Sequence, residues 1–373
     1  MAAPKVAIVH DWMVTPGGGE RVVYELHKIW PEAPVYTSAY DPEKFPEFKD
    51  ADVRTTWLNG IGLARRKQQL FTIPRAWAFK GLDLSDYDIV ISSCSAESKY
   101  VKVGLRTLHV CYCHTPIRYY WSDYGWYRKH PPFGWLNPLA KLVLPLLIPM
   151  LRRMDYNAAQ KVHIFVANSN SVRERIRKYY DRHSEVIFPP VDTAKFHVGQ
   201  GEGEYYLVFG RQVAYKRLDL AVRAFNELGE KLVVGGGGEE INRQKPRAKA
   251  NIRFMGRVPE GEVADLFAKA KALIWPQEED FGITAVEMMA AGRPVIAYAK
   301  GGAFDYVIDG VTGVLFHDQS AESLAEAVKK SQRIKWDRDV IRKHAEKYDN
   351  QVFAAKIKAL VDREYQEFQS KGA

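Results

Sequence analysis

Short apolar runs alternate with amphipathic segments along most of the chain. Runs typical of buried strands occupy 5–11, 88–93, 108–114, 164–169 and 185–190, and then 205–211, 231–238, 251–256, 272–277, 294–299 and 311–316. Helical periodicity covers 20–30, 218–228, 262–270, 283–291, 320–331 and a long charged run at 334–370. Because strands that alternate with helices form parallel sheets with right-handed crossovers, the pattern predicts an α/β protein with two doubly wound domains.

One segment interrupts this alternation. PPVDTAKFHVGQGEGE, residues 189–204, is rich in proline, glycine and charge and therefore predicts a linker. We expect one domain over 1–195, a second over 203–345, and a C-terminal helix over 346–373 whose packing partner is the first domain. Ligands of such sheets bind beyond the carboxyl ends of the strands, so the expected site is a cleft between the domains.

The net charge of the chain indicates which classes of partner it binds. A formal charge of +9 and a pI near 9.2 favour an anionic partner, which could be nucleic acid, a phosphate-bearing metabolite or an acidic membrane face. Aromatic and basic residues are not interleaved along one recognisable face, so nucleic acid is the least favoured of the three.

The cysteines and the N-terminus indicate the compartment. Three cysteines, Cys94, Cys111 and Cys113, give no disulfide framework and are typical of a reducing cytoplasm. The run CYC at 111–113 is apolar, which favours buried thiols over a metal site. MAAPKVAIVHDW has neither the basic n-region nor the long apolar h-region of a signal peptide. These features predict a cytoplasmic protein.

The most apolar stretch is WLNPLAKLVLPLLIPMLRRMD, residues 135–155. It contains Lys141 and three prolines, and it is too interrupted to supply the roughly 20 apolar residues that span a bilayer. Two interpretations remain open: an element that lies on the inner face of the cell membrane, and a buried helix between the domains.

Two glycine runs follow predicted strands. GGG at 17–19 has the position of a phosphate loop, but Val22 replaces the third glycine of a dinucleotide-binding fingerprint, and no P-loop motif occurs in the chain. GGGG at 235–238 is either a flexible turn or a place where the backbone closely approaches a nucleotide, and its surroundings favour the second.

Two charged elements stand at the carboxyl ends of predicted strands. GRQVAYKR, 210–217, places Arg211 and Lys216 beside a helix start, which suits a diphosphate, although a solvated basic turn would have the same composition. EEDFGITAVE, 278–287, places Glu279 in a loop and Glu287 on the following helix. This arrangement fits two separate acceptors for hydroxyl groups better than a carboxylate pair that shares one proton.

Together these motifs resemble the family 4 retaining glycosyltransferases of the two-domain GT-B architecture. The resemblance is carried by six elements that stand in family order: HTP at 114–116, ANSNSVRERI at 167–176, PPVDTAKF at 189–196, G-R-x4-K-R at 210–217, FMGRVPEGE at 254–262 and E-x7-E at 279–287. The opening region, HDWMVTPGGGERVVYELHKIW, is similar to bacterial mannosyltransferases of polysaccharide or O-antigen assembly.

The resemblance implies a role for each motif residue. Arg211 and Lys216 would hold the donor diphosphate, Glu287 would accept from the ribose, and Glu279 from the transferred sugar. His114 would face the sugar near its anomeric carbon. The remaining donor contacts implied by the family are backbone-rich positions: Gly18, Gly19, Arg257, Val258, Phe281, Gly282, Ile283 and Thr284.

The implied reaction retains the anomeric configuration, with attack on the leaving-group face and the diphosphate oxygen taking the acceptor proton. Cations and helix amides would stabilise the diphosphate without a metal. The D-x-D at 86–88 precedes a strand and is interpreted as a strand-entry turn. No cofactor is expected beyond the nucleotide-sugar co-substrate, for which GDP-mannose is favoured over UDP- and ADP-sugars.

The acceptor is less constrained. The first half of the chain is both basic and apolar, as shown by KYVKVGLR, ARRK at 64–67 and the arginines beside 135–155. This composition suggests a glycan or lipid-diphosphate-linked acceptor at a membrane surface. A solvated basic face is the alternative. Asp11, after the first strand, is an acceptor-side candidate or part of the cleft wall. The alternative from another class is a non-catalytic nucleotide- or membrane-binding module.

Overall fold

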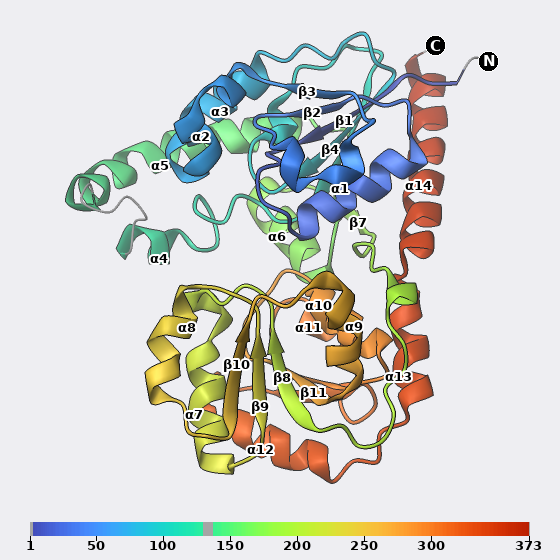
Figure 1. Cartoon of the computed structure of the whole chain (residues 1–373). Coiled ribbons are helices and arrows are strands. Elements are labelled where there is room, and N and C mark those ends of the chain that lie inside the picture. The colour runs from blue at the N-terminus through green and yellow to red at the C-terminus, as the bar shows by residue number, and fades with distance from the viewer. Residues whose placement is uncertain (1–2, 130–136, 373) are drawn as a thin grey trace. The chain divides into compact units, whose positions relative to one another are not determined.

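The computed structural model describes residues 3–129 and 137–372, and within them the chain forms two compact units (Figure 1). The second unit covers Pro189–Phe353, and the first covers the residues before it together with those from Ala354 onward. The sequence predicts the second domain over 203–345, so the structural unit begins earlier and ends later than predicted. The C-terminal helix α14 (Asn350–Gly372) crosses it, because its first turn belongs to the second unit and the rest to the first.

The first unit is built on a seven-stranded parallel sheet in the order β3-β2-β1-β4-β5-β6-β7. Its strands are β1 (Val6–His10), β2 (Val35–Thr37), β3 (Val53–Thr55), β4 (Ile89–Cys94), β5 (Leu108–Cys113), β6 (Ile164–Ala167) and β7 (Ser184–Val186). Its helices are α1 (Gly18–Ile29), α2 (Gly62–Arg66), α3 (Thr72–Lys80), α4 (Tyr124–Lys129), α5 (Asn137–Gln160) and α6 (Asn170–Tyr180), with α14 added at the end. The strand order reverses between β1 and β4, and in such sheets ligands bind at this point.

The second unit repeats this plan with six parallel strands in the order β10-β9-β8-β11-β12-β13. Its strands are β8 (Tyr205–Phe209), β9 (Leu232–Gly235), β10 (Ile252–Gly256), β11 (Ala270–Trp275), β12 (Val295–Tyr298) and β13 (Gly313–Phe316). Its helices are α7 (Leu218–Leu228), α8 (Glu239–Gln244), α9 (Glu260–Ala268), α10 (Ile283–Ala290), α11 (Ala303–Tyr306), α12 (Ala321–Gln332) and α13 (Arg338–Ala345). Here the order reverses between β8 and β11.

Helix α5 contains most of the apolar stretch 135–155, for which the sequence leaves a membrane-surface element and a buried helix open. Residues 137–160 form one continuous helix although Pro145 and Pro149 lie inside it. Each proline removes a backbone donor, so tertiary packing has to stabilise the helix. Ile148 and Leu151 supply it, because they are buried in a cluster that also contains Ile117 and Tyr120. No helix in the described part of the chain is long and apolar enough to cross a membrane.

A buried polar network connects α5 to the 3₁₀ turn Ser98–Tyr100, which follows β4, and to the end of α6. Asp155 is completely buried, and its carboxylate pairs with Lys99 at 2.6 Å. It also accepts hydrogen bonds from Tyr100 at 3.0 Å, Trp121 at 2.7 Å and Tyr180 at 2.8 Å. Burying a charge is tolerated only when it is paired and hydrogen-bonded, and this carboxylate meets both conditions.

The three cysteines lie in the same core. Cys94, Cys111 and Cys113 are free thiols with at most 1% of their surface exposed, as the sequence predicts. Burial raises the pKa of the Cys94 thiol well above its usual value. These side chains therefore fill the core as small apolar groups.

Candidate active site

In the second unit, a lysine and a glutamate meet at the carboxyl ends of the two central strands. Lys216 follows β8 and Glu279 follows β11, and their side chains form an ion pair with Nζ 3.2 Å from Oε1. The Tyr215 hydroxyl donates to the same Glu279 oxygen at 3.3 Å. The side chains of Lys216 and Glu279 keep 14% and 22% of their surface exposed, so both remain reachable by a ligand.

Two residues fix the position of the Lys216 ammonium. Gly210 directly follows β8 with φ +116°, a conformation that favours glycine, and a Cβ there would lie 3.3 Å from Lys216 Nζ. The ammonium also stands 5.4 Å from the ring centroid of Trp275, the last residue of β11. The cation therefore lies at the point where the strand order reverses.

Helix α10 begins beside this pair. Its N-cap, Gly282, has φ +112°, and a Cβ there would be 2.7 Å from the Tyr306 hydroxyl. The amides of Ile283 and Thr284 make no hydrogen bond with the described residues, as expected for the first turn of a helix. Such amides, with the positive end of the helix dipole, form a ready anion site. Phe281, just before the cap, is buried.

A second loop holds the Glu279 loop in place. The amide of Gly302 donates to the carbonyl of Glu279 at 2.9 Å. A Cβ on Gly301 would lie 2.2 Å from that carbonyl oxygen, and one on Gly302 would lie 2.5 Å from the Cα of Phe281. Only glycine permits this approach of two backbones. Sequence reasoning missed both residues, because their contacts are with a loop distant in the chain.

Gly302→Ala is expected to destabilise the second unit by about 1–3 kcal/mol and to weaken nucleotide binding, because the new methyl group pushes on backbone and displaces the Glu279 loop. Thermal unfolding and nucleoside diphosphate titration measure the two effects. Gly261→Ala is the matched control, since a Cβ there has open space inside α9. Equal behaviour of the two variants would show that the close approach has no role.

The other donor-side candidates are distributed around this edge. Glu287 lies on α10 and is buried, with 7% of its surface exposed. Arg211 and Arg257 are exposed, in the loops that follow β8 and β10. Val258 is partly buried, and its side chain would lie 3.5 Å from a Cβ on Gly235.

The folded chain explains why glycines occupy positions 235–238, which the sequence alone does not show. A Cβ on Gly236 would lie 2.0 Å from the carbonyl oxygen of Gly210, and one on Gly238 would lie 2.0 Å from that of Gln212. The run therefore allows the chain to approach its own β8 loop, whereas the sequence favours an approach to a nucleotide. Arg217 is structural as well, because it pairs with Asp219 and donates to Gln319.

In the first unit, a group of polar residues occupies the corresponding edge. His114 follows β5, and its Nε2 lies 2.8 Å from the Ser93 hydroxyl at the end of β4. Ser93 also contacts His10 Nδ1 at the end of β1, through its hydroxyl at 3.2 Å and its carbonyl at 3.0 Å. Gly18 and Gly19 start α1, and a Cβ on Gly19 would lie 3.3 Å from the His10 ring and 3.6 Å from His114 Nε2. The glycine run thus lets α1 begin against both histidines.

Asp11, the acceptor-side candidate, lies just after β1. Its side chain is completely buried and accepts hydrogen bonds from the backbone amides of Ser95, Ala96 and Ser98 and from the Ser95 hydroxyl. Burial by itself would raise the pKa of Asp11, but the neighbouring His10 charge and these amides outweigh it, and the pKa is lowered. Through these contacts Asp11 fixes the loop after β4, which agrees with the wall alternative, while an acceptor-side role for Asp11 stays a prediction.

His10 is a buried titratable group beside the site. Burial disfavours its charged form, yet the hydrogen bond and charge of Glu20, 3.7 Å away, together with Asp11, raise the pKa of His10 above 6.5. A raised folded-state pKa contributes stability that is fully present below the unfolded value of 6.5 and is lost as pH rises through the folded value.

We therefore expect the unfolding free energy of the first unit to fall as pH rises above 6.5, with a slope of at most about 1.4 kcal/mol per pH unit from this residue. His10→Gln is expected to remove this part of the slope, and Glu20→Gln to reduce it. Denaturant titrations across a pH series, followed by tryptophan fluorescence, measure both. An unchanged slope in His10→Gln would assign the pH dependence to other groups.

Among the described residues, no group of three or more His, Cys, Asp or Glu side chains is placed to hold a metal ion. The D-x-D at 86–88 precedes β4, and the Asp88 carboxylate accepts from the Lys5 amide at 2.7 Å. This confirms its interpretation as a strand-entry turn, at the edge opposite to the carboxyl ends.

Comparison with known proteins gives matches in both halves of the chain. Residues 16–195 match the family model described as Glycosyltransferase Family 4, and residues 191–361 match the one described as Glycosyl transferases group 1. A D-inositol 3-phosphate glycosyltransferase of Kribbella flavida is 33% identical over 165 residues, which cover 38% of this chain and 39% of that protein. A glycogen synthase of Xanthomonas campestris is 34% identical over 149 residues, which cover 37% and 31%. The match thus spans less than half the length of either relative.

Solved structures share the architecture over nearly the whole chain. Alr3699/HepE of Anabaena, in complex with UDP and glucose, has a TM-score of 0.71 at 18% identity and covers 96% of this chain and 100% of that one. Sucrose-phosphate synthase of Thermosynechococcus elongatus has a TM-score of 0.71 at 17% identity and covers 98% and 100%. These matches confirm the predicted fold of two Rossmann-like domains. Since the two family matches together run from residue 16 to residue 361, the chain belongs to the glycosyltransferases of the family 4 type, with a GT-B fold.

Proposed function

We propose that the protein transfers a hexose from a nucleotide sugar to a glycan or lipid-linked acceptor, with retention of anomeric configuration and without a metal. The observation that carries the proposal is the pairing of Lys216 with Glu279 beside the amides of Ile283 and Thr284, which make no hydrogen bond with any residue that the structure describes. A cation and helix amides at one strand edge suit a diphosphate, and the carboxylate next to them suits a sugar hydroxyl.

Each residue has a proposed role. Lys216 and Arg211 hold the diphosphate and stabilise the charge that develops on it as the sugar leaves. Glu279 accepts from a hydroxyl of the transferred sugar and Glu287 from the ribose. His114 donates to the sugar near the anomeric carbon, and the departing diphosphate oxygen takes the acceptor proton.

The remaining proposed contacts are made mostly by backbone. Phe281, Gly282, Ile283 and Thr284 contact sugar and phosphates, Arg257 and Val258 flank the base, and Gly18 and Gly19 approach the phosphates or the acceptor.

Two nucleotide sugars are proposed as the donor, in order of preference. GDP-mannose is the first proposal, since the opening region of the sequence resembles mannosyltransferases. UDP-sugars are the second, because Alr3699/HepE is solved with UDP, with UDP-glucose, and with UDP and glucose. Backbone contacts to the base would not by themselves distinguish the two.

Thermal unfolding with GDP, UDP or ADP, each with and without chelator, tests the donor. When a nucleotide binds only the folded protein and its free concentration is 100 times its dissociation constant, it raises the free energy of unfolding by about 2.7 kcal/mol. A GDP-selective shift that chelator leaves unchanged supports the first proposal, and a UDP-selective shift supports the second. No shift with any nucleotide would contradict the proposed function.

The non-catalytic alternative is tested separately by Glu279→Gln. The transferase predicts that this variant loses sugar transfer while its unfolding midpoint stays close to that of the wild type. A simple nucleotide-binding module has no turnover to lose. Release of nucleoside diphosphate from the preferred nucleotide sugar is the measurement.

A further inference from the structure

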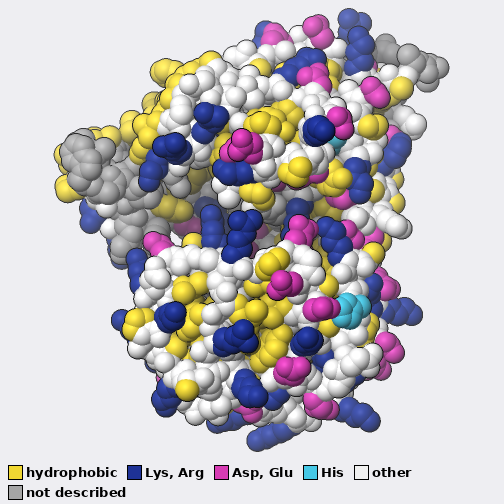
Figure 2. All heavy atoms as spheres, viewed as in Figure 1, with side chains coloured by type: hydrophobic (Ala, Val, Ile, Leu, Met, Phe, Trp, Pro, Cys, Tyr) yellow, Lys and Arg dark blue, Asp and Glu magenta, His cyan; other side chains and the backbone are white. Residues whose placement is uncertain are grey.

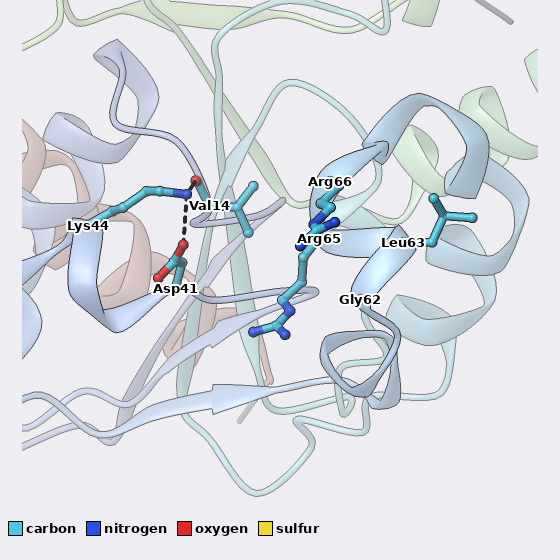
Figure 3. A pocket seen from close by; sticks show the side chains of 7 residues that line it. All are labelled: Val14, Asp41, Lys44, Gly62, Leu63, Arg65 and Arg66. Carbon is cyan, nitrogen blue, oxygen red and sulfur yellow. Dashed lines mark hydrogen bonds and ion pairs between the residues drawn. The ribbon is translucent and has the colours of Figure 1, made fainter.

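A basic cavity lies in the first unit, beside the loop that follows β1. It has a volume of 680 Å³ and is lined by Val14, Asp41, Lys44, Gly62, Leu63, Arg65 and Arg66 (Figure 3). Val14 comes shortly after the carboxyl end of β1, and the neighbouring Met13 pairs with Tyr40 as a parallel bridge. The cavity therefore opens at the carboxyl edge of the sheet, the edge that also carries His10 and His114.

Positive charge exceeds negative charge in this cavity. Lys44 pairs with Asp41 at 2.7 Å and donates to the Val14 carbonyl at 3.0 Å. The hydrogen bond from Lys44 is the main reason that the pKa of Asp41 is lowered, so Asp41 is charged at neutral pH. Arg65 and Arg66 form no ion pair with any described side chain. In Figure 3, Arg65 extends from α2 toward Asp41 and Lys44. Three cations face one carboxylate, which leaves an excess of two positive charges.

An apolar surface continues from the cavity over α2 and α3. Trp57, Leu63 and Trp77 have 59%, 54% and 65% of their surface exposed, and Ile61 and Leu70 are exposed with them. Single exposed apolar residues are common, but a group that includes two tryptophans, on elements of residues 57–80 that contact one another, marks an interaction surface.

Helix α5 adds a second apolar stripe to the same corner. Leu142, Leu146 and Met150 follow one another at intervals of four residues and are 71%, 76% and 47% exposed. Helices α3 and α5 are neighbours, because Ile73 packs into the cluster formed around Ile148. Figure 2 shows hydrophobic side chains gathered over this corner, with Lys and Arg side chains beside them.

We infer that this corner of the first unit binds a lipid that carries a phosphate or diphosphate group. Arg65, Arg66 and Lys44 hold the phosphate oxygens in the cavity. The exposed apolar side chains of residues 57–77 and of α5 contact the hydrocarbon chain of the lipid and the membrane in which it is anchored. This assignment rests on the proposed function and names its acceptor class: a lipid-linked phosphate or diphosphate.

The charges and the apolar surface favour a lipid over a soluble phosphate. An excess of two positive charges matches a diphosphate diester, and arginine forks suit phosphate oxygens. A soluble metabolite would leave the two exposed tryptophans without a role. Basic residues beside tryptophan and leucine are typical of proteins that lie on anionic membranes.

The test measures binding of three probes to the full chain: farnesyl diphosphate, inorganic diphosphate and farnesol. All titrations contain saturating nucleoside diphosphate, so that the donor site is occupied. Farnesyl diphosphate is expected to bind more tightly than either other probe. Binding of farnesyl diphosphate no tighter than that of inorganic diphosphate would overturn the role of the apolar surface.

Two variants locate the site. Arg65→Ala/Arg66→Ala is expected to weaken farnesyl diphosphate binding by about tenfold or more, since each charge-assisted contact contributes about that factor. The matched control, Arg106→Ala/Lys161→Ala, removes the same charge from exposed positions of the same unit and is expected to leave binding unchanged. Trp77→Ser/Leu146→Ser is expected to weaken farnesyl diphosphate but not inorganic diphosphate. Equal weakening by both charge-removing variants would overturn the proposal, because it would indicate only a diffuse attraction.

Nucleotide binding by the same variants separates the two hypotheses. If the wild type binds GDP or UDP but the Arg65 and Arg66 variant binds farnesyl diphosphate normally, this inference fails and the proposed function stands. If farnesyl diphosphate binding depends on Arg65 and Arg66 but no nucleotide binds, the proposed function fails and the lipid site stands.

Discussion

Lys216→Met is expected to lower kcat/KM for sugar transfer by about 100- to 1000-fold, the usual effect of removing one group that stabilises developing charge. Lys216 is the cation at the point where β8 and β11 end, and it is held between Gly210, Trp275 and Glu279. Methionine keeps the length and the apolar stem of the side chain, so the loss isolates the charge. Release of nucleoside diphosphate from the preferred nucleotide sugar is the measurement.

Lys245→Met is the matched control for this variant. Lys245 is exposed on the 3₁₀ turn Lys245–Arg247 of the same unit, so the same loss of charge there is expected to leave turnover unchanged. The unfolding midpoint of Lys216→Met should stay close to that of the wild type. Turnover within a few-fold of the wild type would remove Lys216 from the catalytic group.

Asp155→Asn is expected to destabilise the first unit by about 3–5 kcal/mol, the cost of removing one partner from a buried ion pair. The amide has nearly the shape of the carboxylate, so packing changes little. It leaves the Lys99 ammonium, which has 1% of its side chain exposed, without a counter-charge. An amide nitrogen also cannot accept one of the hydrogen bonds that Tyr100, Trp121 and Tyr180 now donate.

Tyr100→Phe provides the comparison, because it removes one neutral donor from the same carboxylate and leaves the ion pair intact. Its expected cost is about 1 kcal/mol. Denaturant unfolding of both variants, followed by tryptophan fluorescence, measures the difference. Similar costs for Asp155→Asn and Tyr100→Phe would mean that water or a local rearrangement compensates Lys99.

The strands of both sheets could be predicted where they are buried on both faces. Runs such as IVI at the start of β4 and ALIW in β11 are continuous and apolar, and the structure places strands there. The bounds of α7, 218–228, agree with the amphipathic pattern. Strands β2 and β3 were missed, because three residues are too few to show a period, and their place at the edge of the sheet depends on pairing with β1. The predicted helical run 334–370 is in fact broken at Glu346–Tyr348.

Some residues of the candidate site could likewise be predicted from the sequence, and others could not. Lys216 and Glu279 could be identified from local motifs, because each directly follows a strand. The Gly301–Gly302 backbone could not, since its role depends on a loop about 20 residues earlier that only the folded chain brings within contact. Asp11 is a different case: its sequence position suggests a ligand contact, and only the folded chain shows that amides of residues 95–98 donate to its carboxylate.

The positions of the cysteines allow local opening of the first unit to be measured by thiol modification. All three thiols belong to the first unit, and residues 189–353 contain none. A buried, protonated thiol reacts with an alkylating reagent only when its surroundings open. The rate of thiol modification in native buffer therefore measures the opening equilibrium of one unit in the intact chain. A nucleotide that binds only the second unit can slow this reaction only if the two units are energetically coupled.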